Sequence, residues 1–267
     1  MNILVPIDFS KDAEKALEYA IYLAKKKEAS VEMIHIIDLV YDFASQAAIA
    51  LDSMHTDAHK ILNELKSKYV DSGVPISFVI KEGSPSITIT KYAQETGKNL
   101  IVMGTKGAGG AVKIVFGSTT VNLIKESTIP VLVVPKNADL TQIRGLTLAM
   151  DFSEHERKFL AWVVDICKSW EFELSFLHIL CHPTFREELA CIGLKSYVEK
   201  NHGDGDYNYL TESAENPQEG LNNHLERNPD TILVVCHEHK NFWNQLTKKS
   251  QSIELAYAAN TPLLILI

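Results

Sequence analysis

A glycine-rich segment in the first half of the chain is the strongest candidate for ligand chemistry. Gly104 and Gly107 stand three residues apart after an apolar run. Gly117 comes ten residues later and is followed by two hydroxyl residues, Ser118 and Thr119. Backbone N–H groups beside glycine can approach a phosphate without an intervening Cβ, and a helix beginning here would add its positive dipole end. The pattern favours a phosphate-binding loop, with a flexible surface loop as the alternative.

Three residues near the ends of two other apolar runs could complete such a site. Pro6 and Asp8 close the first run, and Ile36 closes the second. Asp8 could accept hydrogen bonds from a base or a ribose, or could merely cap a turn or a helix. Ile36 could pack on a purine face, or could belong to the core. Ligands of parallel α/β sheets bind at the carboxyl ends of the strands, where these residues would meet the glycine loop.

The spacing of the glycines separates this segment from two common phosphate binders. It contains no G-x-x-x-x-G-K-[ST], the P-loop pattern, and no G-x-G-x-x-G follows the first apolar run. What remains is a Gly104-x2-Gly107-x9-Gly117-Ser118 pattern.

The chain repeats itself. Ile3–Ser10 and Leu146–Ser153 are both apolar runs that end in Asp-Phe-Ser, and 27 residues separate the Asp from a His in each half. Two further pairs of apolar runs follow in the same order. Such ordered self-similarity indicates two copies of one structural unit.

Apolar runs and segments of helical spacing alternate along each copy. The runs are apolar throughout rather than every second residue, which is typical of parallel strands covered by helices on both faces. The predicted fold is therefore α/β, with two tandem doubly wound, Rossmann-like domains at residues 1–138 and 139–267. Each is expected to hold a five-stranded, mostly parallel sheet. In the first copy we expect strands at 3–7, 31–37, 76–80, 100–103 and 131–134 and helices at 11–24, 44–71, 87–96 and 118–126.

The first half resembles the universal stress proteins, in the branch whose G-2x-G-9x-G-[S/T] loop binds ATP. The resemblance covers residues 1–138 and, more weakly, 139–267; it includes the opening Val5–Ser10, the strand end His35–Asp38 and the closing Pro130–Val134. It implies that Pro6, Asp8 and Ile36 hold adenine and ribose. It also implies a phosphate site formed by Met103, Gly104, Gly107, Gly117, Ser118 and Thr119.

The same resemblance implies Mg²⁺ between the phosphates. The loop contains no carboxylate, so such an ion would depend on phosphate oxygens and water. Members of the family pair through the last strand, so the two halves are expected to pair within the chain, with a further homodimer left open.

The second half has lost the glycines. When the repeats are aligned, Cys236, His239 and Lys249 replace Gly104, Gly107 and Gly117, so we expect one nucleotide per chain. Cys236, His237 and His239, with Cys181 or His182, could instead bind zinc, but the usual ligand spacings are missing and a polar loop is the alternative. Cys167 is expected in the core. Residues 187–220 are acidic and are expected to form a solvated insertion or loop.

Composition excludes several classes of protein. Residues 1–138 carry 15 basic and 15 acidic side chains, and residues 139–267 carry 11 and 19. No basic run supports nucleic-acid binding, and no apolar run is long enough to span a membrane. With no visible signal peptide and four cysteines, we expect a cytoplasmic protein with reduced thiols.

The sequence favours an ATP-binding stress or regulatory protein over a fast enzyme. No catalytic base or arginine finger can be placed beside the glycine loop, where only Lys106 and Lys113 supply positive charge. Slow ATP hydrolysis or self-phosphorylation remains open. The alternatives are a nucleotide-activating enzyme that converts ATP to AMP or hydrolyses it, and an adaptor protein without a ligand.

Overall fold

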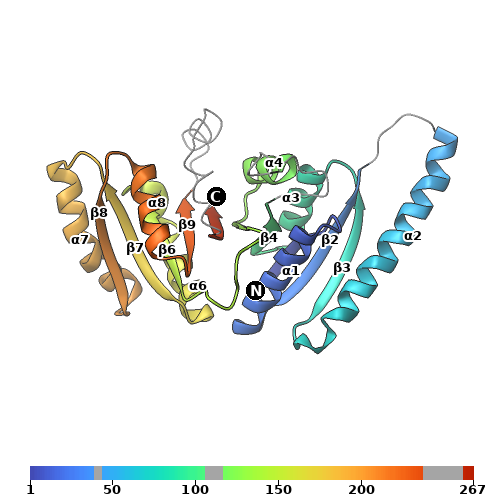
Figure 1. Cartoon of the computed structure of the whole chain (residues 1–267), viewed down its shortest axis with the longest axis horizontal. Coiled ribbons are helices and arrows are strands. Elements are labelled where there is room, and N and C mark those ends of the chain that lie inside the picture. The colour runs from blue at the N-terminus through green and yellow to red at the C-terminus, as the bar shows by residue number, and fades with distance from the viewer. Residues whose placement is uncertain (39–43, 106–116, 237–260) are drawn as a thin grey trace. The chain divides into compact units, whose positions relative to one another are not determined.

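The computed structural model describes residues 1–38, 44–105, 117–236 and 261–267, without the side chains of 44–50 and 155. The chain divides into two compact units, unit 1 (Met1–Lys136) and unit 2 (Asn137–Ile267) (Figure 1). No helix of the described residues is long and apolar enough to cross a membrane.

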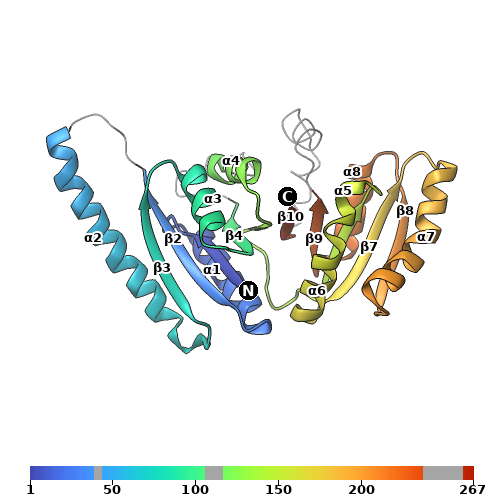
Figure 2. The same cartoon turned by 180° about the vertical axis from the view of Figure 1, so that it is seen from behind.

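Unit 1 is a parallel sheet with helices on both faces. Its strands lie in the order β3-β2-β1-β4-β5, and the four neighbouring pairs are parallel. Helices α1 and α2 pack on one face and α3 and α4 on the other, as the two opposite views show (Figures 1 and 2). The strands are β1 (Asn2–Pro6), β2 (Ser30–Ile37), β3 (Ile76–Glu82), β4 (Leu100–Gly104) and β5 (Val131–Val134). The helices are α1 (Lys11–Lys26), α2 (Ala44–Lys68), a short 3₁₀ turn (Val70–Ser72), α3 (Pro85–Glu95) and α4 (Ser118–Glu126).

Unit 2 repeats this order as β8-β7-β6-β9-β10, again with parallel neighbours. Its strands are β6 (Gly145–Met150), β7 (Glu173–Leu180), β8 (Tyr207–Ser213), β9 (Thr231–Cys236) and β10 (Leu263–Leu266). Its described helices are α5 (Glu154–Arg157), α6 (Leu160–Trp170), α7 (Phe185–His202) and α8 (Pro217–Arg227). The predicted α/β class with parallel, doubly wound sheets is confirmed.

The central strands form the core because their side chains are buried on both faces. Every residue of β5 and of β10 is buried, and so are the first four residues of β4. This explains the uninterrupted apolar runs of the sequence. Cys167 is buried as expected, and its thiol donates to the carbonyl of Phe172 at 2.8 Å.

The prediction for residues 187–220 is wrong. Most of α7, all of β8 and the start of α8 lie in that segment. Thr184 and Glu187 form a capping box that fixes the start of α7, and β8 pairs with β7 over seven residues. The helix escapes a periodicity test because its apolar residues lie on opposite sides: Val198 is buried, whereas Phe185 and Ile192 are exposed.

Candidate functional site

The candidate site residues of unit 1 lie at the carboxyl ends of adjacent parallel strands. Pro6 ends β1, Ile36 precedes the last residue of β2, and Met103 and Gly104 end β4. Because β2, β1 and β4 are neighbours in this order, these residues share one edge of the sheet.

The start of α4 is tied to the same edge. The amide of Gly117 donates to the carbonyl oxygen of Thr105 at 2.7 Å, and the hydroxyl of Thr120 donates to the carbonyl of Gly104 at 3.3 Å. Gly117 is the N-cap residue of α4. No side chain at this position accepts a hydrogen bond from the first amides of the helix. The first amides and the positive dipole end of α4 therefore lie beside the end of β4 (Figure 1).

Hydroxyl groups surround the start of α4. Ser118 is exposed and Thr119 is half-buried, so both can be reached from solvent. Gly107 lies outside the described residues, as do Lys106 and Lys113. The arrangement offers backbone amides and hydroxyls, which are groups suited to an anion.

Gly104 is glycine for a reason that the sequence did not reveal. A Cβ at this position would lie 2.8 Å from the backbone carbon and oxygen of Asp12 in α1. The Asp12 carboxylate also accepts a hydrogen bond from the Thr105 hydroxyl at 3.3 Å. Helix α1 therefore approaches the end of β4 closely and holds the entrance to the glycine loop.

Asp8 lies in a turn. Its Oδ1 accepts hydrogen bonds from the amide of Ser10 at 3.1 Å and from the Ser10 hydroxyl at 2.6 Å. Ser10 in turn accepts from the amide of Ala13 and caps α1. Asp8 therefore stabilises a turn, which is one of the two roles that the sequence left open for it. Its side chain is also exposed at the edge of the sheet.

Next to this turn, His35 makes a set of contacts that the sequence pattern did not predict and that we call a histidine clamp. The Nδ1 of His35 donates to the carbonyl of Ile7 at 2.7 Å, and its ring lies 4.3 Å from that of Phe9. Phe9 has a positive φ of 64°, an uncommon conformation for a side chain of this size. The available signal was the sequence separation of 27 residues, which is the same between Asp8 and His35 as between Asp151 and His178.

Unit 2 repeats the clamp closely. The Nδ1 of His178 donates to the carbonyl of Met150 at 2.8 Å, and its ring lies 4.5 Å from Phe152, whose φ is 61°. Oδ1 of Asp151 accepts from the amide of Ser153 at 2.9 Å. The turn after the first strand is thus retained in both units.

The rest of the corresponding edge differs in unit 2. Glu156 stands where unit 1 has Ala13, is buried, and accepts from the amide of Asp151 through Oε1 at 2.7 Å. Burial raises the pKa of Glu156 to about 8, with the charge of Asp151 adding to the effect. Burial likewise raises the pKa of the Cys236 thiol to about 12, aided by Glu156 and Asp151.

The zinc alternative gains no support from the described part of unit 2. Those residues contain no group of three potential ligands, and His237 and His239 lie outside them.

Known proteins resemble both the first half and the whole chain. Residues 1–135 match the universal stress protein family. Universal stress protein YxiE of Bacillus subtilis (strain 168) is 32% identical over 144 residues, which are 50% of this chain and 97% of that protein. Among solved structures, a universal stress protein from Archaeoglobus fulgidus DSM 4304 covers 99% of this chain and 97% of its own, with a TM-score of 0.79 and 20% identity. A universal stress protein solved in complex with cAMP covers 50% of this chain and 96% of its own, with a TM-score of 0.41 and 20% identity.

The match to the family spans one full repeat, and the likeness to the Archaeoglobus structure extends the fold to both. The chain belongs to the universal stress protein family.

Proposed function

We propose that the protein is a nucleotide-responsive regulatory protein that binds one ATP at the edge of unit 1. The observation that carries the proposal is the hydrogen bond from Gly117 to Thr105, because it brings the uncapped start of α4 to the end of β4. Amides at a helix start, two hydroxyls and flanking glycines form a suitable environment for phosphate. Gly107, from outside the described residues, would complete the loop.

The adenosine end would lie over the neighbouring strands. Pro6 and Ile36 are both half-buried and present apolar surface suited to the adenine ring. The exposed carboxylate of Asp8 can accept hydrogen bonds from ribose hydroxyls while it holds the turn at Ser10. The clamp from His35 to Ile7 fixes that turn.

Mg²⁺ fits this site only as a companion of the phosphates. The described edge supplies hydroxyls, amides and the carboxylates of Asp8 and Asp12, and the described residues contain no group of three His, Cys, Asp or Glu side chains that could hold a metal ion. Phosphate oxygens and water would therefore form most of the coordination sphere, with Ser118 or Thr119 as candidate protein ligands.

Regulation suits the site better than rapid catalysis. Phosphoryl transfer needs a positioned base or nucleophile and positive charge at the γ-phosphate. The described edge offers Asp8 and Asp12, each already hydrogen-bonded within the protein. Hydrolysis, if any, is expected to be slow, below about 1 per second.

The test starts with the native ligand. Bound small molecules are released from the freshly purified protein by denaturation and identified by mass spectrometry, and ATP, AMP and cAMP are then titrated calorimetrically.

Gly117→Val places a branched side chain at the start of α4 and should weaken ATP binding by at least about tenfold, or 1.4 kcal/mol. Ser250→Val, at the equivalent of Ser118 in unit 2, is the matched control and should bind like the wild type. Equal losses from both variants would rule out a site in unit 1 alone. Release of AMP and pyrophosphate from ATP would instead favour the nucleotide-activating enzyme.

A further inference from the structure

Helix α7 carries an exposed apolar stripe on the side that faces away from its own sheet. Phe185, Leu189 and Ile192 are 75%, 53% and 76% exposed. They follow one another at spacings of four and three residues, so they lie along one line of the helix. Among the other described residues, Val70 and Ile87 are isolated exposed apolar side chains, and Met54 and Ile61 lie two turns apart on α2 and are less exposed, at 47% and 40%.

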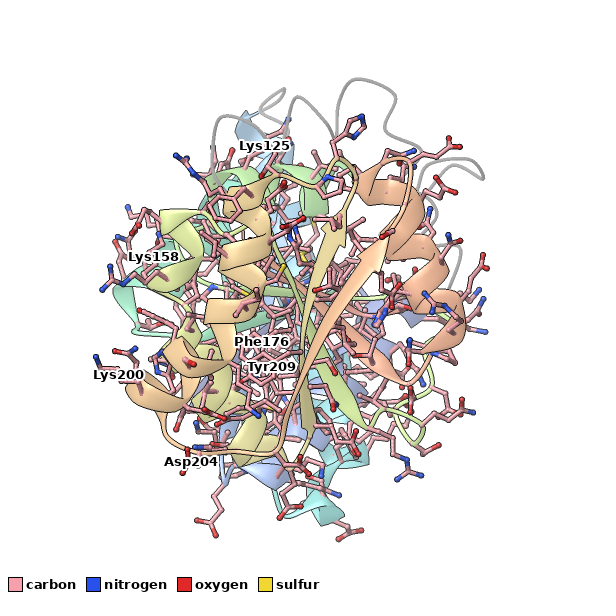
Figure 3. The ribbon with its side chains drawn as sticks, turned by 90° about the vertical axis from the view of Figure 1, so that its left-hand side faces the viewer. Lys125, Lys158, Phe176, Lys200, Asp204 and Tyr209 are labelled. Carbon is pink, nitrogen blue, oxygen red and sulfur yellow. The ribbon has the colours of Figure 1, made fainter. Side chains whose placement is uncertain are left out.

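The opposite side of α7 is the one that holds it to unit 2. Val198 is fully buried, and Cys191 and Leu194 on the same side are half-buried. Figure 3 looks onto α7, with Lys200 in its last turn and the stacked rings of Phe176 and Tyr209 toward the sheet. The stripe therefore does not contribute to the packing of α7 on unit 2. Exposed apolar surfaces of this kind mark contacts with other molecules.

We propose that this stripe is a self-association surface, on which α7 of a second copy of the chain packs antiparallel. The spacing of Phe185, Leu189, Ile192 and Ser196 is that of alternating d and a positions of a heptad repeat. In an antiparallel pair, a positions meet d positions. Leu189 then faces Ile192 of the second copy, and Phe185 faces the small Ser196.

The flanking charges select this orientation. Glu188 and Lys195 occupy the two g positions beside the stripe, and g positions face one another only in antiparallel pairs. Glu188 of each copy would meet Lys195 of the other, giving two equivalent opposite-charge pairs. A parallel pair would instead place Glu188 beside Gly193, which offers no charge, and Lys195 beside Lys200, which carries the same charge.

Other neighbours of the stripe are compatible with this pairing. Arg186 would lie over Gly193 of the second copy, which has no side chain to oppose it. Lys195 pairs within its own helix with Glu199 at 3.7 Å, an exposed contact that leaves the ammonium free to take a second carboxylate. The capping box of Thr184 and Glu187 fixes the start of the helix, which lowers the ordering cost of association.

The contact is small, so the association should be weak and dependent on concentration. Sedimentation equilibrium of the full chain over a wide concentration range should show monomers and dimers. Ile192→Lys places a charge in the centre of the stripe and should weaken dimerisation by about tenfold or more. Ile87→Lys, at an isolated exposed residue of α3, is the matched control and should leave it unchanged.

Charge reversal identifies the partner as a second α7. Glu188→Lys and Lys195→Glu each place like charges at both contacts, so each variant alone should dimerise about tenfold more weakly. A 1:1 mixture of the two should regain association as heterodimers, because every g position then meets its opposite charge. Circular dichroism confirms that the variants are folded. A monomeric wild type, dimers insensitive to these changes, or a mixture that fails to regain association would overturn the proposal.

Discussion

At the scale of single residues, Gly104 shows that one glycine can serve packing as well as binding. Its missing Cβ makes room for the backbone of Asp12, at distances of 2.8 Å from an ideal Cβ. In unit 2 the equivalent residue is Cys236, and the equivalent helix is divided into α5 and α6. In unit 1 the close contact with Asp12 therefore joins the start of the glycine loop to α1.

Gly104→Ala should therefore destabilise the protein even without a ligand. The added methyl group would have to displace the backbone of α1, at a cost of about 1–3 kcal/mol. Gly193→Ala is the matched control, because nothing lies within 4 Å of its Cβ and alanine favours a helix by about 0.5–1 kcal/mol. Urea unfolding measures both, and the two changes should differ in sign.

Glu156 should make stability depend on pH. Its folded-state pKa of about 8 lies above the ordinary value of 4.5, so the folded protein holds a proton that the unfolded chain releases. Stability from this group is therefore greatest below pH 4.5 and is lost as the pH rises toward 8, by about a few kcal/mol in total. Glu156→Gln keeps an acceptor for the amide of Asp151 but cannot ionise. Urea unfolding from pH 5 to 9 should show less loss in this variant than in the wild type, and equal slopes would contradict the assignment.

At the scale of elements, the two histidine clamps show how a turn of uncommon backbone geometry is held. His35 and His178 each bond the carbonyl at the end of the first strand of their unit and pack against a phenylalanine of positive φ. Because both units have a histidine clamp, the clamp is a feature of the fold. Only in unit 1 does the same edge of the sheet lead into a glycine loop.

Replacing each histidine should separate these two roles. His35→Phe and His178→Phe each leave a carbonyl without its donor, and each should cost about 1–3 kcal/mol of stability. Only His35→Phe should also weaken ATP binding, because the turn at Asp8 adjoins the proposed adenosine site. Unfolding and calorimetry on both variants make the comparison. Equal ATP affinities would mean that the turn does not contribute to binding.

Elements with a plain pattern could be predicted from the sequence, and those held by tertiary contacts could not. The helix at 118–126 and the strand at 131–134 have their predicted bounds, because a glycine directly before the helix and an apolar run define them locally. Helix α7 was missed because it presents apolar residues both to its sheet and to solvent. The role of Asp12 and the burial of Glu156 depend on contacts between segments far apart in sequence, which no local pattern encodes.

At the scale of the whole molecule, two copies of one fold have diverged in chemistry. Residues 1–138 carry no net charge, whereas the rest carries the entire excess of eight negative charges. In unit 2 the buried Glu156 already accepts the hydrogen bond of the Asp151 amide, and Cys236 stands at the position equivalent to Gly104. An edge whose amide is already satisfied by the protein itself, in a half of the chain with eight excess negative charges, is a poor environment for a triphosphate.

The full chain should consequently bind about one ATP, although it contains two units of the same fold. Titration calorimetry of nucleotide-free protein gives this stoichiometry directly, and Gly117→Val should remove the binding heat rather than halve it. A second equivalent of ATP, with half of the heat left in Gly117→Val, would show that unit 2 binds nucleotide despite Glu156. In that case Glu156→Gln should alter the remaining half, because its side chain contacts the amide of Asp151 at the same edge.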